Sequence, residues 1–171
     1  MHSGKVLAGC DDQVFYLRFT GDVRLSWCLI LESYCSYVLE HEDVTSMVID
    51  LSAAVNLDST TLGILAKIGQ AARKRFDAKA DIYLQDEGIQ RLLLSMGFTQ
   101  LFALHLAPPP RTPSLPVLPL GDSEEADIQD SVIDAHRALM EMNKQNTRKF
   151  QSLVETLERA REGEPPSSSK K

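Results

Sequence analysis

Residues 47–76, MVIDLSAAVNLDSTTLGILAKIGQAARKRF, constrain the fold more than any other stretch of this chain. The run MVIDL at 47–51 is short and apolar, which is typical of a buried strand. From Leu62 to Phe76 the apolar residues recur at helical spacing. A buried strand therefore runs into a helix through an extended segment and the turn DSTT at 58–61.

This turn places side-chain oxygens at the N-terminus of the predicted helix. Backbone N–H groups are free there, and the helix dipole presents its positive end. Asp58, Ser59, Thr60 and Thr61 are all residue types that cap helices, and the sequence leaves open which of them does so. Ser59 is accordingly interpreted in two ways, as part of a helix cap or as a regulatory phosphorylation site.

The pattern Asp-Ser-x-x-Leu-Gly after a strand resembles the phosphorylation turn of the STAS-domain anti-sigma factor antagonists. In that family a partner kinase phosphorylates the serine that follows the aspartate, so the resemblance assigns this role to Ser59 and places Asp58 beside it. Leu62 and Gly63 match the Leu-Gly pair of the family. Thr61 departs from the pattern, because the family usually has glycine there, and it adds another hydroxyl.

The elements around the turn predict an α/β domain over residues 11–107, the range that the resemblance covers. The expected order is β-β-α-β-α-β-α-β, which matches the STAS fold, a mixed sheet with helices packed on it. Residues 1–10 show no pattern and are expected to be loose. The expected strands are 13–19, 23–25, 47–51, 81–84 and 101–106, and the expected helices are 26–40, 59–76 and 87–96.

The C-terminal third has a different composition. Residues 107–121 hold six prolines, so a proline-rich, extended linker is expected at 108–121. Residues 122–163 predict one long amphipathic helix that starts at a capping pair, Asp122 and Glu125, and ends at Gly163. Residues 164–171 are expected to form a disordered tail.

The predicted long helix carries an apolar seam with one extra four-residue step around Asn146. A helix of about 40 residues would reach about 60 Å, so its apolar face must meet something. The sequence leaves three occupants open, namely its own sheet domain, a second copy, or a second protein partner. The expected interface residues are Leu139, Met142, Phe150, Leu153 and Leu157.

Composition narrows the possible partners and the compartment. The chain has 171 residues, enough for one domain with an appendage, and a net charge of −6, which disfavours nucleic acid and anionic membranes. No apolar run is long enough to span a bilayer. Three cysteines without a CxxC pair suit a reducing compartment. The sequence LAGC at 7–10 resembles a lipoprotein box, but the segment before it is too short for a signal peptide. A cytoplasmic protein is expected.

The sequence contains no phosphate-binding loop, no zinc-protease motif and no metal-ligand spacing. Its four histidines, at 2, 41, 105 and 136, are scattered and are expected to be incidental. Cys28 and Cys35 lack a histidine base on a neighbouring element. We therefore expect no enzyme activity, no catalytic residues, no metal and no cofactor.

The helix after the turn also suggests a docking surface. If its apolar positions face the sheet, then Thr60, Gly63, Ile64 and Lys67 point outward beside Ser59. Gly63 and Ile64 would then form an exposed flat patch for a partner.

The resemblance implies partner switching. The unphosphorylated protein would bind an anti-sigma factor or a related regulator through Ser59 and this patch. A serine kinase would end that binding by phosphorylating Ser59, and a phosphatase would restore it. Two alternatives remain open at this stage, a scaffold or oligomerisation module that uses the C-terminal helix, and a STAS module that binds a small ligand.

Overall fold

The computed structural model describes residues 4–24, 28–119 and 124–163. From α1 to β5 its regular elements follow the predicted order, and two further helices come after the sheet domain. They are β1 (Lys5–Asp11), β2 (Val14–Val23), α1 (Cys28–His41), β3 (Ser46–Leu57), α2 (Ser59–Phe76), β4 (Ala80–Leu84), α3 (Glu87–Ser95), the 3-10 helix η2 (Phe98–Gln100), β5 (Phe102–Leu106), α4 (Glu125–Met140) and α5 (Lys144–Arg161).

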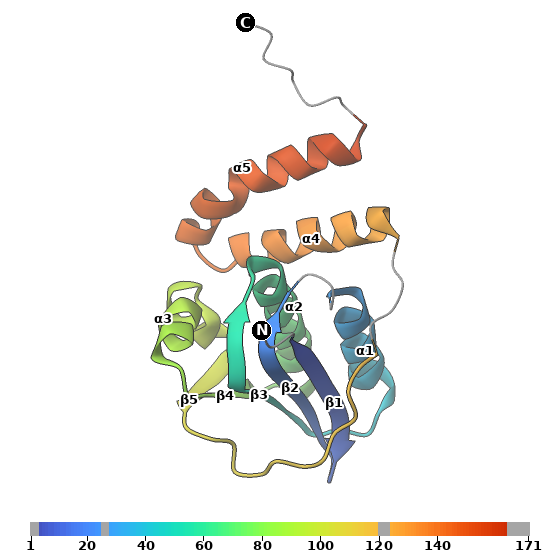
Figure 1. The fold of residues 1–171 in the computed structure, drawn as a ribbon, viewed down its shortest axis with the longest axis vertical. Coiled ribbons are helices and arrows are strands. Elements are labelled where there is room, and N and C mark those ends of the chain that lie inside the picture. The colour runs from blue at the N-terminus through green and yellow to red at the C-terminus, as the bar shows by residue number, and fades with distance from the viewer. Residues whose placement is uncertain (1–3, 25–27, 120–123, 164–171) are drawn as a thin grey trace, which may run out of the picture.

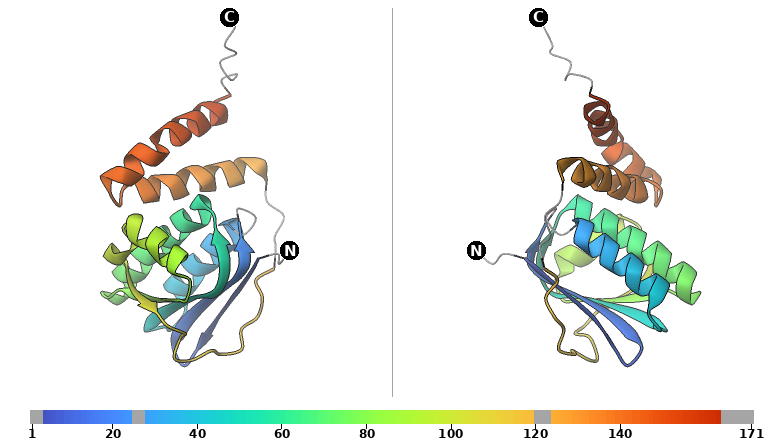
Figure 2. Two further views of the ribbon diagram at one scale, coloured as in Figure 1. Left: turned by 60° about the vertical axis from the view of Figure 1, so that its left-hand side comes forward. Right: turned by 90° about the vertical axis from the view of Figure 1, so that its right-hand side faces the viewer.

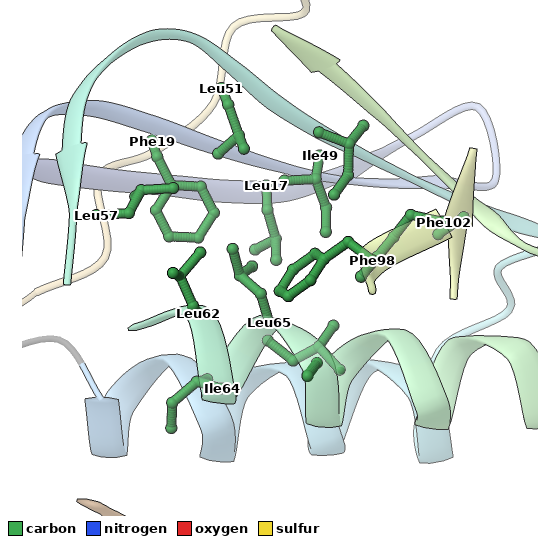
Figure 3. Close-up of a cluster of buried hydrophobic side chains, with 14 of the residues drawn as sticks. Leu17, Phe19, Ile49, Leu51, Leu57, Leu62, Ile64, Leu65, Phe98 and Phe102 are labelled. Atoms are coloured by element: carbon green, nitrogen blue, oxygen red, sulfur yellow. The ribbon is translucent and has the colours of Figure 1, made fainter. Parts of the chain in front are cut away.

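The five strands form a mixed sheet, which confirms the predicted fold class. The strand order is β1-β2-β3-β4-β5, with β1 antiparallel to β2 and the other pairs parallel. Helices α1 and α2 lie side by side along one face of this sheet (Figures 1 and 2). The core between them and the sheet is apolar, and Leu17, Ile49 and Leu65 are fully buried in it (Figure 3).

The N-terminal segment is ordered, so the expectation of a loose residue range 1–10 is wrong from residue 5 onward. Strand β1 pairs with β2 along its whole length, and Val6 and Ala8 are fully buried. The hairpin turn is at Asp12 and Gln13, which both have positive φ. The separate strand predicted at 23–25 is also wrong, because β2 runs without a break to Val23 and residue 25 lies outside the described residues.

The proline-rich linker is held against the sheet edge. The Ala8 backbone N–H donates to the carbonyl of Pro116 at 3.1 Å, and the Leu118 N–H donates to the carbonyl of Val6 at 2.8 Å. Arg111 makes an ion pair with Asp11 at 2.8 Å. This pairing satisfies backbone groups of an edge strand that would otherwise be open to another chain.

The C-terminal segment folds into two helices, so the expectation of one continuous helix at 122–163 is wrong. The chain turns at residues 141–143, and the Asn143 side chain caps α5 by accepting from the Asn146 N–H at 2.7 Å. The buried Asn146 amide donates to the carbonyls of Leu139 and Met96 at 2.8 and 2.9 Å. The stutter of the apolar seam therefore marks the corner of a helical hairpin. The predicted cap Asp122 and the tail 164–171 lie outside the described residues.

The α4–α5 hairpin folds back on its own domain. Helix α4 lies across the N-terminal part of α2, and α5 lies on the outer side of α4 (Figures 1 and 2). Leu139, Met142 and Phe150 are buried in this packing, so they are not available as the interface with a partner that the seam suggested. Of the other predicted seam residues, Leu157 is half-buried and Leu153 is exposed.

We predict that Asn146→Ala lowers the free energy of unfolding by about 1–3 kcal/mol, the usual cost of one unsatisfied buried group. The substitution removes the side-chain donor of the Met96 carbonyl, whereas the Leu139 carbonyl keeps the Met142 backbone N–H as a donor at 3.1 Å. Urea denaturation followed by circular dichroism measures the change. Gln151→Ala, on the exposed side of α5, is the matched control and should stay within about 0.5 kcal/mol of wild type. Equal midpoints for Asn146→Ala and wild type would contradict this role.

Candidate regulatory site at the start of α2

The turn between β3 and α2 carries the predicted phosphorylation site, and Asp58 is its cap. The Asp58 carboxylate accepts a hydrogen bond from the Thr61 backbone N–H at 2.8 Å. Asp58 has extended backbone angles, and Ser59 is the first residue of α2. Of the capping residues that the sequence left open, the structure therefore selects Asp58, and the Ser59 hydroxyl is directed to a different partner.

That partner is His136 of α4. The Ser59 Oγ lies 2.8 Å from His136 Nε2, and His136 Nδ1 lies 2.7 Å from the carbonyl oxygen of Val132. Because a carbonyl only accepts, Nδ1 carries the proton in this network, and in the neutral ring Nε2 accepts from the serine hydroxyl. His136 is 1% exposed, and the Phe150 ring of α5 packs edge-on against it at 5.2 Å.

His136 is the main residue of the site that the sequence did not reveal, since we expected it to be incidental. It lies 77 positions from Ser59. The only sequence signal was its place next to Ala135 of the apolar seam. That seam predicted burial of the helix face but not the surface that the face would cover.

Helix α4 crosses α2 at Gly63, where the two backbones are in direct contact. A Cβ atom at Gly63 would lie 2.2 Å from the carbonyl oxygen of Ala135, which is far inside the normal contact distance. The glycine that the resemblance matched to a Leu-Gly pair therefore serves here as the crossing point of two helices. No larger residue fits without a shift of α4.

The expected exposed patch is covered, and this part of the prediction is wrong. Leu62 and Leu65 point toward the sheet, whereas Ile64 points the opposite way, as the helical pattern predicted (Figure 3). Ile64 is nevertheless fully buried, and Thr60 and Thr61 are 7% and 2% exposed. The pattern on α2 identified the side that faces away from the sheet, but it could not show that α4 covers that side.

Lys67, the last of the predicted patch residues, belongs to a polar network that joins three helices. Its ammonium group forms an ion pair with Glu32 of α1, and both side chains are partly exposed. Glu32 also accepts a hydrogen bond from the Ser131 hydroxyl of α4 at 3.2 Å. Glu32 therefore links α1 to both α2 and α4.

Arg24 lies near the turn from the side of the sheet. It follows Val23, which pairs with Leu57 just before the turn, and it makes an ion pair with Asp22 at 2.6 Å. The hydrogen bond with Asp22 and that residue's charge raise the pKa of Arg24, with Asp58 adding a smaller effect. Arg24 thus supplies a cation beside the Asp58–Ser59 turn.

An open, acidic groove of about 550 Å³ lies between α1 and α4. Anionic ligands are disfavoured by its charge. The described residues hold no group of histidine, cysteine and carboxylate side chains arranged to bind a metal ion. The residues that line the groove are Leu29, Glu32, Ser33, Glu124, Asp127, Asp130, Ser131 and Asp134.

The Ser59 hydroxyl joins α2 to α4 through a hydrogen bond to a buried histidine. A serine–histidine contact also occurs in nucleophilic enzymes, where a third group orients the histidine. Here the orienting group is a backbone carbonyl, and Phe150 packs against the imidazole. Cys35 is 1% exposed, and burial raises the pKa of its thiol, which disfavours the reactive thiolate.

The comparisons with known proteins give the fold and no closer relationship. No protein-family model matches the chain, and no curated protein matches it. Among solved structures, it is similar to the crystal structure of an anti-sigma factor antagonist from Mycobacterium paratuberculosis, with 24% identity and a TM-score of 0.51. The match covers 60% of this chain and 86% of that one. The sheet domain therefore has the STAS-type fold that the serine motif implied. In the described part of the chain no helix combines the length and apolar character that a bilayer span requires.

We predict that Gly63→Ala destabilises the protein by about 1–3 kcal/mol, the usual cost of overpacking, although alanine is the better helix former. The methyl group would collide with the Ala135 carbonyl. Thermal and urea unfolding measure the effect. Gln70→Ala on the exposed side of α2 is the control and should stay within about 0.5 kcal/mol of wild type. If Gly63→Ala were at least as stable as wild type, α4 would not sit on Gly63 in solution.

Proposed function

We propose that this protein is a partner-switching regulator of the anti-sigma factor antagonist class, with Ser59 as its phosphorylation site. The unphosphorylated chain binds an anti-sigma factor or a related regulator in the cytoplasm. A serine kinase ends this binding by modifying Ser59, and a phosphatase restores it. In this proposal the protein is a substrate and a ligand rather than an enzyme.

The observation that carries the proposal is the placement of Ser59. It follows a capped turn and does not itself cap α2, so its hydroxyl is not required to hold the helix together. Ser59 is half-buried, whereas the neighbouring hydroxyls of Thr60 and Thr61 belong to buried residues. Among the three candidates in the turn, Ser59 is therefore the acceptor that a kinase reaches most readily.

A phosphoryl group at Ser59 would be tolerated by the sheet domain. It carries a charge of about −1.5 to −2, and the N-terminus of α2 offers free backbone N–H groups and a favourable dipole. Arg24 adds a cation beside the same turn. A protein partner seated over the turn would instead meet new bulk and charge. Breaking such a contact costs roughly 2–5 kcal/mol, which weakens binding by tens to thousands of fold.

The structure gives less support to the alternative functions. A scaffold that works through the C-terminal seam would need Leu139, Met142 and Phe150 at its surface, and these residues are buried within the chain. If the protein were a module that binds a small ligand, the acidic groove between α1 and α4 would disfavour an anionic one.

We predict that the protein isolated from its native cells carries phosphate on Ser59. Trypsin releases residues 25–67 as one peptide, and fragmentation by mass spectrometry distinguishes Ser59 from Thr60 and Thr61. In pull-downs from native lysate, Ser59→Ala should capture a regulator that Ser59→Asp does not. Phosphate found only on a threonine, or the same proteins captured by both variants, would overturn the proposal.

A further inference from the structure

The surface of α2 that a partner would use is already occupied by a helix of the same chain. Helix α4 meets Gly63 at backbone distance and holds the Ser59 hydroxyl through His136, and the neighbouring Ile64 is fully buried. The covered surface therefore has the shape and chemistry to accept a single amphipathic helix with a small residue at the crossing point. We call this surface the helix-docking face and define it by Ser59, Thr60, Gly63, Ile64 and Lys67.

The contact between α4 and the helix-docking face is partly polar. It includes the Ser59–His136 hydrogen bond, and beside the face Ser131 donates to Glu32 of α1, which makes an ion pair with Lys67. Contacts between separable units of one chain are more polar than a domain core, and they resemble transient interfaces between proteins. The first half of α4 is also strongly acidic, with Glu125, Asp127, Asp130 and Asp134.

The fold of the sheet domain also occurs in a shorter chain. Since 60% of 171 residues corresponds to 86% of the similar solved chain, that chain has about 120 residues. The same fold therefore exists in a chain about fifty residues shorter. In this protein the linker is pinned to β1 as far as Leu118, and α4 begins at Glu125. A short connection thus joins the domain to the helix that covers it.

We propose that the helix-docking face binds one amphipathic helix of a regulatory partner, and that α4 is its intramolecular competitor. This inference rests on the proposed function and names the kind of partner and the means of its regulation. Docked α4 lowers the affinity for the partner, because the partner must first displace it. The partner helix carries a small residue where it crosses Gly63 and an apolar side chain over Ile64.

Phosphorylation of Ser59 acts on both competitors. It removes the hydroxyl hydrogen that His136 accepts, and it places a dianion beside the acidic helix α4. Both effects weaken the hold of α4. The same dianion opposes a partner helix seated over Ser59, so the partner does not bind the modified face even when α4 has left it.

A peptide of residues 124–143, labelled with a fluorophore, tests this inference by titration against the full chain. In the chain, Ala135→Glu puts a charge at the crossing point of α4 and leaves every residue of the helix-docking face unchanged. We expect the peptide to bind the Ala135→Glu chain at least about tenfold more tightly than the wild-type chain, whose own α4 competes. A peptide that itself carries Ala135→Glu, and one of residues 144–163, are matched controls that should not bind.

A second variant makes the test independent of whether Ala135→Glu folds, which circular dichroism reports. Asn146→Ala weakens the anchor of the hairpin corner and changes neither α4's contact surface nor the helix-docking face. The peptide should bind this chain more tightly than wild type as well. Failure of the peptide to bind any folded variant with a loosened α4 would overturn the inference.

A double variant separates this inference from the proposed function. Adding Ser59→Asp to the Ala135→Glu chain should weaken peptide binding by at least about tenfold, from the loss of a polar contact at the interface. Peptide binding in a protein whose Ser59 is never phosphorylated in cells would support the docking face and refute the switch. Phosphate on Ser59 without peptide binding would support the switch and refute the docking face.

Discussion

The contact between α4 and α2 at Gly63 is the constraint on which the candidate site depends. A Cβ at this position would lie 2.2 Å from the Ala135 carbonyl, so the two backbones approach this closely only because residue 63 is glycine. The approach brings His136 within hydrogen-bond distance of Ser59, and it buries Ile64. With α4 held there, α5 packs Phe150 against the outer side of His136.

Few interactions connect the stability of the α4 cover to the proposed switch at Ser59. The Ser59–His136 hydrogen bond contributes about 1 kcal/mol net, which is small beside the apolar burial of Leu139 and Phe150. A change at Ser59 therefore shifts the balance between the covered and open states of the helix-docking face without unfolding the sheet domain. Asn146 at the corner of the hairpin favours the covered state, because its two hydrogen bonds hold the end of α4 near Met96.

Local patterns were sufficient to predict the sheet domain, because each of its helices and most of its strands bury a periodic apolar face. The capped turn before α2 and the outward direction of Ile64 followed from the same patterns. Strand β1 was missed because its apolar run is short, with Val6 and Leu7 followed by the small residues Ala8 and Gly9. The cover by α4 could not be derived from sequence, since it joins residues 77 positions apart through a hairpin whose turn contains neither glycine nor proline. Asn143 as a helix cap, with the stutter at Asn146, was the available signal for that turn.

Hydrogen exchange by mass spectrometry on the full chain tests the central claim, that α4 covers Ser59 reversibly under the control of that residue. The account predicts faster exchange in α4 for Ser59→Asp than for wild type, with β4 unchanged, because a carboxylate cannot donate the hydrogen bond that the neutral His136 ring accepts. Ser36→Asp, which puts the same charge on an exposed serine of α1, should leave α4 at its wild-type rate. Equal α4 exchange in Ser59→Asp and wild type would show that Ser59 does not control the cover.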